Sequence, residues 1–264
     1  ILKLAVIERH HNTGHKGIGF INGIGLKKGA IASSVSHDSH NLIVIGTNDE
    51  DMATAANHIK SIGGGNVVVV DGEIIEEMPL VVAGLMLTSR RVAAAYDWCK
   101  TLKGEGENVG KLVEKGKSQF AGPEILGKTL GVVGLGAIGR LVAVAANNLG
   151  MKIVGYDPYF NEALKGELPA DTEYVDSLDA IYEKADYITL HLPCTKDTKG
   201  MINAETIAKM KDGVRILNFA RGELVDTDSI LAALENGKVA AYVTDFPNDA
   251  VIGATGVIAI PHLG

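Results

Sequence analysis

The feature that most constrains how this chain can fold is a glycine pattern between a strand and a helix. The segment Leu130–Val133 is a short apolar run, as expected of a buried strand. They run into a G-x-G-x-x-G pattern formed by Gly134, Gly136 and Gly139, and an apolar helical pattern follows. Gly134 permits the tight turn, Gly136 lets the backbone approach a bound group, and Gly139 lets helix and strand pack closely. The pattern predicts a strand–turn–helix unit of a parallel sheet.

The same turn predicts a dinucleotide site. The amides of the first helical residues, Ala137 and Ile138, would face a pyrophosphate with the helix dipole behind them. The next predicted strand, Lys152–Tyr156, ends at Asp157, eighteen residues past Gly139 (157 − 139). A carboxylate there would accept hydrogen bonds from ribose hydroxyls and repel a 2′-phosphate, so NAD is favoured over NADP. A plain glycine turn with a surface aspartate is the alternative, and the strand context argues against it.

Strands and helices alternate from Thr129 onward, which is typical of a parallel sheet. Three strands, a crossover and three more predict a doubly wound (Rossmann) sheet. The predicted strands are 131–134, 152–156, 187–190, 215–218, 240–244 and 257–260, and the predicted helices are 137–149, 177–184, 204–210 and 228–235.

The residues before the predicted sheet do not show this regular alternation of strands and helices. One long helix is predicted over 82–102, followed by a polar, glycine-dotted stretch to Gly127. The first eighty residues show predicted strands at 4–8, 42–45 and 66–70 and a helix at 48–59. The predicted fold class is therefore α/β, a doubly wound parallel sheet preceded by a smaller α/β segment.

Composition excludes several functions. A net charge of −7 gives no basic surface for nucleic acid or anionic membranes. The longest apolar run, residues 79–88, is too short to span a bilayer. The two cysteines, Cys99 and Cys194, lack metal-ligand or CxxC spacing, which favours a reducing, cytoplasmic location. The chain begins at Ile1 and stops directly after a site motif, so we expect a fragment of a longer protein.

Polar groups follow the predicted strands at their carboxyl ends, where ligands of open α/β sheets bind. Each alone could be a surface ion pair or a turn residue, but four groups in register favour a site. They comprise His191 with Pro193, Ala220 with Arg221, Asp245, and His262.

These residues and the motifs around them resemble the D-isomer-specific 2-hydroxyacid dehydrogenases, most closely the 3-phosphoglycerate dehydrogenases. The matching motifs are Gly-Leu-Gly-Ala-Ile-Gly139, Tyr156-Asp-Pro-Tyr159, His191-Leu-Pro193, Leu217-Asn-Phe-Ala-Arg221 and Pro261-His-Leu-Gly264. The resemblance covers about Ser89 to Gly264.

The resemblance implies an NAD-dependent dehydrogenase acting on a small 2-hydroxy acid, 3-phosphoglycerate of serine biosynthesis, and a homodimer. It implies that Arg221 binds the substrate carboxylate and that His262 is the general acid/base. It also implies that Asp245 holds the nicotinamide carboxamide and Asp157 the adenosine ribose. His191, Pro193 and Ala220 would complete the cofactor site. Histidine and arginine suit this chemistry, since one titrates near neutral pH and the other fixes a carboxylate bidentately.

One position departs from the family pattern. The wider family carries a Glu a few residues after the Asp245 position, paired with the catalytic histidine. Here the stretch reads Asp245-Phe-Pro-Asn-Asp249-Ala250. Asp249 is a candidate substitute, but its shorter side chain makes this pairing a weak expectation.

The first part is similar instead to the C-terminal region of bacterial adenine deaminases, over about residues 1–86. The motifs on which this resemblance rests are Val6-Ile-Glu-Arg-His10, Gly25–Ser34, Ser36-His-Asp-Ser-His-Asn41, Gly46-Thr-Asn-Asp49 and Pro79–Met86. Deamination needs a metal-bound hydroxide. His37, Asp38 and His40 form a candidate metal cluster, but ligands so close in sequence rarely complete a site, so no metal is predicted.

We therefore expect two domains, residues 1–86 and 87–264, joined by a gene fusion or by a misassembled reading frame. Three functions remain open: an NAD-dependent dehydrogenase module, an adenine deaminase fragment, and an NAD-binding module without turnover. We expect this chain to bind NAD and to catalyse weakly or not at all, because the residues ahead of the helix do not look like a dehydrogenase substrate domain.

Overall fold

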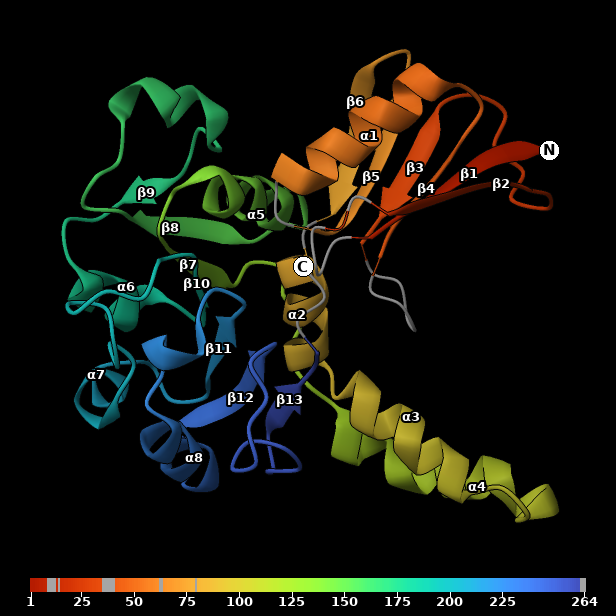
Figure 1. Cartoon of the computed structure of the whole chain (residues 1–264). Coiled ribbons are helices and arrows are strands. Elements are labelled where there is room, and N and C mark those ends of the chain that lie inside the picture. The colour runs from red at the N-terminus through yellow and green to blue at the C-terminus, as the bar shows by residue number, and fades with distance from the viewer. Residues whose placement is uncertain (9–12, 14, 35–40, 62–63, 79, 262–264) are drawn as a thin grey trace. The chain divides into compact units, whose positions relative to one another are not determined.

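The computed structural model describes the chain except for residues 9–12, 14, 35–40, 62–63, 79 and 262–264. The chain forms two compact units (Figure 1). The first comprises Ile1–Val82, with Pro261 grouped with it, and the second comprises Ala83–Ile260. The division falls inside the helix α2 (Leu80–Ser89).

In its described residues the first unit is an antiparallel sheet packed against the helix α1 (Asp49–Ser61). Its strand order is β2-β1-β4-β3-β5-β6, and each described neighbouring pair is antiparallel. The strands are β1 (Leu2–Ile7), β2 (Lys16–Ile21), β3 (Ala30–Ser33), β4 (Leu42–Gly46), β5 (Asn66–Val70) and β6 (Glu73–Met78).

The core of this unit lies between α1 and the central strands. Alternate residues of β3, β4 and β5 are buried, as expected of strands with one covered face. Met52 of α1 packs so closely on Gly46 that a Cβ there would lie 2.4 Å from the Met52 side chain.

Three strands of the first unit, β2, β3 and β6, were not predicted. In β2 the apolar residues alternate with glycine, which looks like a broken loop in sequence. Its Ile18 and Phe20 are more than three-quarters exposed, so no buried face marks it as a strand. The sheet becomes recognisable only through its pairing.

The second unit is a parallel sheet of seven described strands, in the order β13-β12-β11-β10-β7-β8-β9. This order confirms the doubly wound fold, with its switch point between β7 and β10. The strands are β7 (Thr129–Val133), β8 (Lys152–Tyr156), β9 (Glu173–Tyr174), β10 (Tyr187–Leu190), β11 (Val214–Asn218), β12 (Val239–Thr244) and β13 (Val257–Ala259).

One strand assignment was wrong. Tyr187–Leu190, predicted as the third strand, is the fourth and starts the second half of the sheet. The third is β9, which has only two residues and therefore no periodicity to reveal it. It pairs with Val154 and Gly155 of β8 at the sheet edge.

Helices cover both faces of the parallel sheet. The predicted helices are present as α5 (Ala137–Asn148), α6 (Leu178–Lys184), α7 (Ala204–Ala208) and α8 (Thr227–Glu235). Ile181, Ile207 and Ile230 from α6, α7 and α8 share one buried cluster with Ile188 and Ile216 of the sheet. On the other face, Gly139 of α5 lies close to Val132 and Gly84 of α2 close to Leu217.

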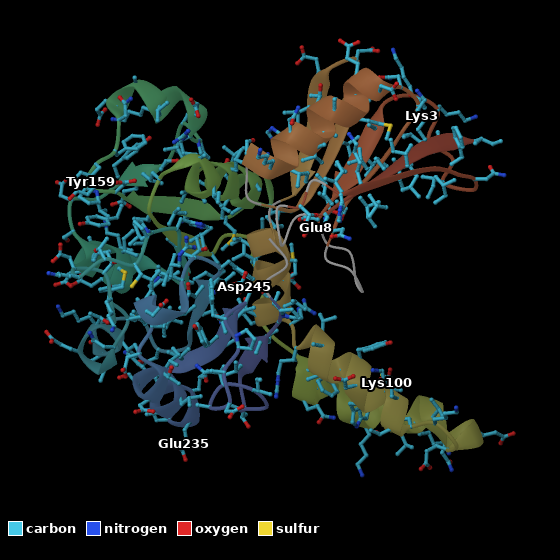
Figure 2. The ribbon with its side chains drawn as sticks, viewed as in Figure 1. Lys3, Glu8, Lys100, Tyr159, Glu235 and Asp245 are labelled. Carbon is cyan, nitrogen blue, oxygen red and sulfur yellow. The ribbon has the colours of Figure 1, made fainter. Side chains whose placement is uncertain are left out.

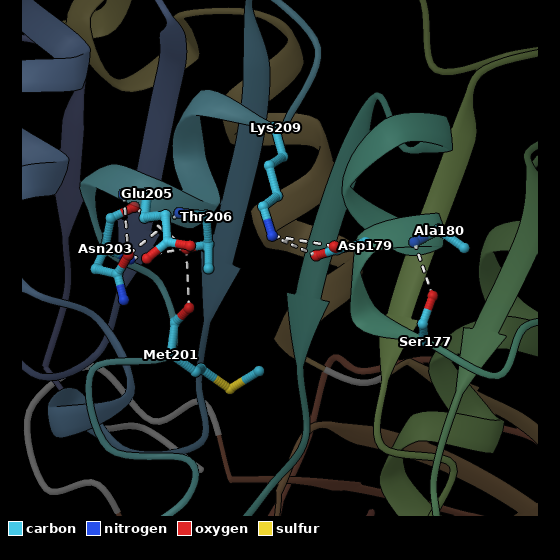
Figure 3. Close-up of polar contacts among 8 residues, drawn as sticks. All are labelled: Ser177, Asp179, Ala180, Met201, Asn203, Glu205, Thr206 and Lys209. Carbon is cyan, nitrogen blue, oxygen red and sulfur yellow. Dashed lines mark hydrogen bonds and ion pairs between the residues drawn. The ribbon is translucent and has the colours of Figure 1, made fainter.

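Caps fix the helices of the first face (Figure 3). The side chains of Ser177 and Asn203 accept backbone N–H groups at the starts of α6 and α7, and Asn203 forms a capping box with Thr206. Lys209 then pairs with Asp179 at 3.0 Å and links the two helices.

The single helix predicted over 82–102 is in fact two, α2 and α3 (Val92–Thr101). Thr88 and Ser89 donate their hydroxyls to the carbonyls of Gly84 and Leu85, at 2.8 and 2.6 Å. Side-chain bonds of this kind compete with the helical backbone and bend or end it. Ser89 also bonds the Tyr187 hydroxyl at 2.8 Å, which anchors the helix end on the sheet.

Beyond this break, the glycine-dotted stretch holds unpredicted helical turns. They are η1 (Gly106–Asn108), α4 (Val109–Gly116) and η2 (Lys117–Phe120). In α3 and α4 no residue is buried, and the rings of Trp98 and Phe120 pack at a tilt of 46° with a centroid distance of 5.3 Å. Within the described part of the chain, no helix has the length and apolar character needed to cross a membrane.

Candidate functional site: a nucleotide-binding crevice

The glycine turn between β7 and α5 has the backbone that its sequence demands. Gly134 has φ of +97°, in the region that favours glycine, and its N–H donates to the Tyr156 carbonyl at 2.8 Å. A Cβ on Gly134 would lie 2.5 Å from the His191 carbonyl oxygen. The turn therefore ties β7 to both neighbouring strands, β8 and β10.

The other two glycines serve opposite purposes. A Cβ on Gly139 would lie 2.0 Å from the Gly134 carbonyl oxygen, so the helix can approach the turn only because Gly139 has no side chain. A Cβ on Gly136 would meet nothing within 4 Å. Residues Gly136, Ala137 and Ile138 are exposed between buried neighbours, and no side chain caps α5. The start of α5 is thus open to an external anion.

Asp157, at the end of β8, faces this turn. Its Oδ2 accepts the Leu135 N–H at 2.9 Å, and its Oδ1 accepts the Tyr159 N–H at 2.8 Å. Each carboxylate oxygen can accept a further hydrogen bond. The carboxylate is therefore fixed in direction by the protein and retains capacity for ribose hydroxyls.

His191 lies across the turn, at the end of β10. Its backbone N–H donates to the Val133 carbonyl at 2.8 Å, and its ring Nε2 lies 2.9 Å from the hydroxyl of the buried Thr189. Burial lowers the pKa of His191 to about 4, so the ring is neutral at pH 7. Pro193 is exposed two residues later, and its carbonyl accepts the Thr198 hydroxyl at 2.8 Å.

The low pKa predicts a pH dependence of stability. Between pH 6.5 and 4 the unfolded chain protonates His191 and the folded chain does not, so acid favours unfolding. We expect the free energy of unfolding to fall by about 1–3 kcal/mol over this range, less than the full value because His191 is half-buried as a residue. Urea unfolding at several pH values measures this. His191→Gln removes the titrating group, and an equal pH slope in that variant would contradict the assignment.

Arg221 is positioned by a residue that sequence reasoning had not singled out. The buried Asn218 ends β11, and its Nδ2 donates to the Arg221 carbonyl at 2.9 Å. Its Oδ1 accepts the N–H groups of Ala220 at 3.2 Å and Arg221 at 3.4 Å. Asn218 thus closes a tight turn that presents the exposed Arg221 at the carboxyl edge of the sheet. The position of Asn218 within the Leu217–Arg221 motif is the sequence feature that could have identified it.

Asp245 follows β12 at the same edge and is labelled in Figure 2. Its side chain is buried, beside Tyr242, and its charge contributes to raising the pKa of Tyr242, after the larger effect of burial. Phe246 packs over Gly222, where a Cβ would lie 3.1 Å from the Phe246 Cβ. The loops that carry Arg221 and Asp245 are therefore in contact.

A second missed residue, Arg140, lies in the first turn of α5. Its Nη1 donates to the Leu135 carbonyl at 2.9 Å, and its Nε donates to Glu167 at 2.9 Å. Arg140 directly follows the last motif glycine, but nothing in the sequence indicates a partner 27 positions away.

Some predicted residues lie outside the described part of the chain. These are His262 and the candidate cluster His37, Asp38 and His40. Asp249 is described and is exposed in the loop after β12. Among the described residues no cluster of three or more His, Cys, Asp or Glu side chains could hold a metal ion.

The residues present fit a dinucleotide. The Gly136 position leaves open space beside uncapped helical amides, where a pyrophosphate would lie. Asp157 lies beside this turn, and the switch point between β7 and β10 is where ligands of such sheets bind. Comparison with known proteins agrees with this geometry. The profile of the D-isomer specific 2-hydroxyacid dehydrogenase NAD binding domain matches residues 82–264.

The chain belongs to this family. Residues 82–264 are its NAD-binding domain, so NAD is the cofactor. The profile of the adenine deaminase C-terminal domain matches residues 1–112. The first part of the chain is therefore similar to a second family, as the sequence predicted. Because the two matches overlap at residues 82–112, the join between residues 86 and 87 stays a prediction.

Three curated relatives illustrate the two halves. D-3-phosphoglycerate dehydrogenase of Bacillus subtilis is 41% identical over 157 residues, covering 57% of this chain and 29% of the relative. Hydroxypyruvate reductase of Thermotoga maritima is 43% identical over 157 residues, covering 56% and 49%. Adenine deaminase of Brucella anthropi is 48% identical over 121 residues, covering 46% and 21%. The chain thus matches between a fifth and a half of the length of these relatives.

Solved structures resemble the dehydrogenase part. The holo form of D-mandelate dehydrogenase from Rhodotorula graminis is 30% identical, with a TM-score of 0.58 over 68% of this chain and 52% of that one. D-lactate dehydrogenase with NAD+ from Lactobacillus jensenii is 29% identical, with a TM-score of 0.56 over 69% and 57%. The dehydrogenase family is thus supported by both sequence and fold.

Proposed function

We propose that the second unit transfers a hydride between NAD and a D-2-hydroxy acid, with 3-phosphoglycerate as the substrate. The observation that carries this proposal is the Asn218 turn, which presents Arg221 at the same sheet edge as the glycine turn. A guanidinium at that edge provides the planar, bidentate partner that a substrate carboxylate requires.

Each site residue has a proposed role. Arg221 binds the substrate carboxylate; one of its five donors, on Nη1, already bonds the Ala220 carbonyl at 2.6 Å and so steadies the side chain. His262 takes the hydroxyl proton as the general base and returns it in the reverse direction. Asp245 holds the carboxamide of the cofactor, and Asp157 its adenosine ribose. When bound, NAD accepts the hydride.

The remaining cofactor contacts come from the turn and the neighbouring loops. The backbone of residues 134–139 receives the pyrophosphate, and His191, Pro193 and Ala220 line the crevice. Because the His191 pKa is low, its ring adds no positive charge at neutral pH and serves as a neutral hydrogen-bonding group.

Support for 3-phosphoglycerate comes from the Bacillus subtilis relative, whereas other relatives are named for hydroxypyruvate and D-lactate. Single-turnover oxidation of NADH tests the proposal. The chain is mixed at high concentration with phosphohydroxypyruvate, hydroxypyruvate or pyruvate, beside Arg221→Gln as the matched control. We expect slow NADH oxidation, fastest with phosphohydroxypyruvate and absent in the variant.

Other outcomes separate the competing functions. NAD binding without oxidation above the Arg221→Gln background would leave a binding module without turnover. Rapid steady-state turnover of 3-phosphoglycerate by this chain would contradict our expectation of weak catalysis, which rests on the different family ahead of unit two. The deaminase alternative is supported by the match over residues 1–112 and predicts release of ammonia from adenine with added divalent metal. We expect none.

We further propose that the chain forms a homodimer through the projecting helices of the second unit. No residue of α3 or α4 is buried. On α3 the apolar side chains of Val92 and Tyr96 are 52% and 66% exposed. Apolar helix faces of this kind mark association surfaces. Light scattering behind a sizing column should give twice the mass of the 264-residue chain, and Tyr96→Glu should give the monomer mass. A monomer at all concentrations would contradict the proposal.

The reaction is proposed to take place in the cytoplasm. Both cysteines, Cys99 and Cys194, are unpaired thiols in the structure, which agrees with a reducing compartment.

A further inference from the structure

Arg140 is the only arginine in the first turn of α5, and it is held from two sides. Its Nη1 donates to the Leu135 carbonyl and its Nε to Glu167 Oε2, both at 2.9 Å. Only 15% of its side chain is exposed, whereas Glu167 is 58% exposed. Glu167 ends η3 (Glu162–Glu167), which follows the Asp157 loop. The guanidinium thus lies between the glycine turn and the segment that follows β8.

The same residue that receives Arg140 also contacts Asp157. Leu135 donates its N–H to Asp157 Oδ2 at 2.9 Å, while its carbonyl accepts Arg140. One residue of the turn therefore separates the carboxylate that excludes a 2′-phosphate from a guanidinium suited to bind one. Left unpaired, Arg140 would work against the discrimination that Asp157 provides.

We propose that Glu167 is a specificity-determining residue, which holds Arg140 on the Leu135 carbonyl and withholds its charge from the 2′-phosphate of NADP. The ion pair compensates the positive charge, and the two hydrogen bonds fix the plane of the guanidinium. Arg140 then braces the glycine turn, and Asp157 alone sets the preference for NAD. This inference rests on the proposed contact between Asp157 and the adenosine ribose.

The test measures the dissociation constants of NAD and NADP for the full chain and for Glu167→Gln. Glutamine keeps the size and a hydrogen-bond acceptor but removes the charge. We expect NADP to bind about five- to tenfold more tightly relative to NAD in this variant, as an arginine released toward a phosphate would provide. Repeating the titrations at high salt should reduce the gain.

Two further variants separate specificity from a general effect. Glu162 lies in the same η3 turn, is paired with Lys165 at 3.2 Å and forms no described hydrogen bond or ion pair with Arg140, so Glu162→Gln removes an equal charge as the matched control. We expect its NADP-to-NAD ratio to change less than twofold. The double variant Glu167→Gln with Arg140→Gln should lose the gain, because Arg140 is its source.

An unchanged NADP-to-NAD ratio in Glu167→Gln would overturn the proposal, as would an equal change in Glu162→Gln. Parallel weakening of both nucleotides would also overturn it and would assign Glu167 a purely structural role. If the unaltered chain binds neither nucleotide, the NAD site itself is contradicted, which is a different result from an unchanged ratio. Thermal unfolding of each variant confirms that the compared chains are folded.

Discussion

Replacing Gly139 with alanine is expected to lower the free energy of unfolding by about 2–4 kcal/mol. Alanine is normally the better helix former, by about 1 kcal/mol, so propensity alone predicts the opposite sign. The added Cβ would lie 2.0 Å from the Gly134 carbonyl oxygen, which is backbone and has little freedom to move. Either α5 or the glycine turn must shift. Urea unfolding followed by circular dichroism measures the change.

Two other glycines provide controls for this result. Gly110 lies in α4, and a Cβ there would meet nothing within 4 Å, so Gly110→Ala should stabilise the chain by about 0.5–1 kcal/mol. Gly136 has φ of −62° and equally open space, so Gly136→Ala should change the unfolding free energy by less than about 0.5 kcal/mol. A Gly139→Ala chain as stable as Gly110→Ala would contradict the close packing of α5 on the turn.

Asp157→Ala is expected to weaken NAD binding by about 1–3 kcal/mol, or roughly 5- to 150-fold. The variant loses the proposed bonds to the ribose and also the acceptors of the Leu135 and Tyr159 N–H groups, so the turn loosens as well. Calorimetric titration measures the loss, and Asp157→Asn separates the two causes. Asparagine can still accept one backbone N–H but carries no charge, so it should bind NAD better than the alanine variant does.

The discrimination against NADP should fall in both Asp157 variants, because the repulsion of the 2′-phosphate depends on the carboxylate charge. NAD affinity that is unchanged in Asp157→Ala would remove this residue from the cofactor site. Equal loss of NAD affinity in the alanine and asparagine variants would attribute the effect to charge rather than to the support of the turn.

The local pattern of the sequence predicted those parts of the fold in which backbone geometry or close packing restricts the residue type at each position. Gly134 has the positive φ that the turn requires, and Gly139 allows the close approach of helix and turn. The alternation of strands and helices after Thr129 was equally readable because each element buries a face. By contrast, β9 has only two residues, and β2 exposes its apolar side chains, so neither leaves a recognisable pattern.

Contacts between distant residues were beyond the reach of sequence reasoning. The break between α2 and α3 depends on where the hydroxyls of Thr88 and Ser89 find acceptors, and on Tyr187 far along the chain. Likewise, the partner of Arg140 lies in a 3-10 turn that no periodicity reveals. For the candidate site, residue types and strand ends were predictable from the sequence, whereas the turn closed by Asn218 and the hydrogen bond from Arg140 to the Leu135 carbonyl are visible only in the structure.

The NAD site is tested most directly by a calorimetric titration of the purified, folded chain with NAD and, in parallel, with NADP and adenine. We expect saturable binding of NAD, much weaker binding of NADP, and loss of the NAD signal in Gly136→Val, whose side chain would occupy the open space at the start of α5. A folded chain that binds no NAD, or that binds NADP equally well, would contradict the central claim that residues 82–264 form an NAD-selective crevice.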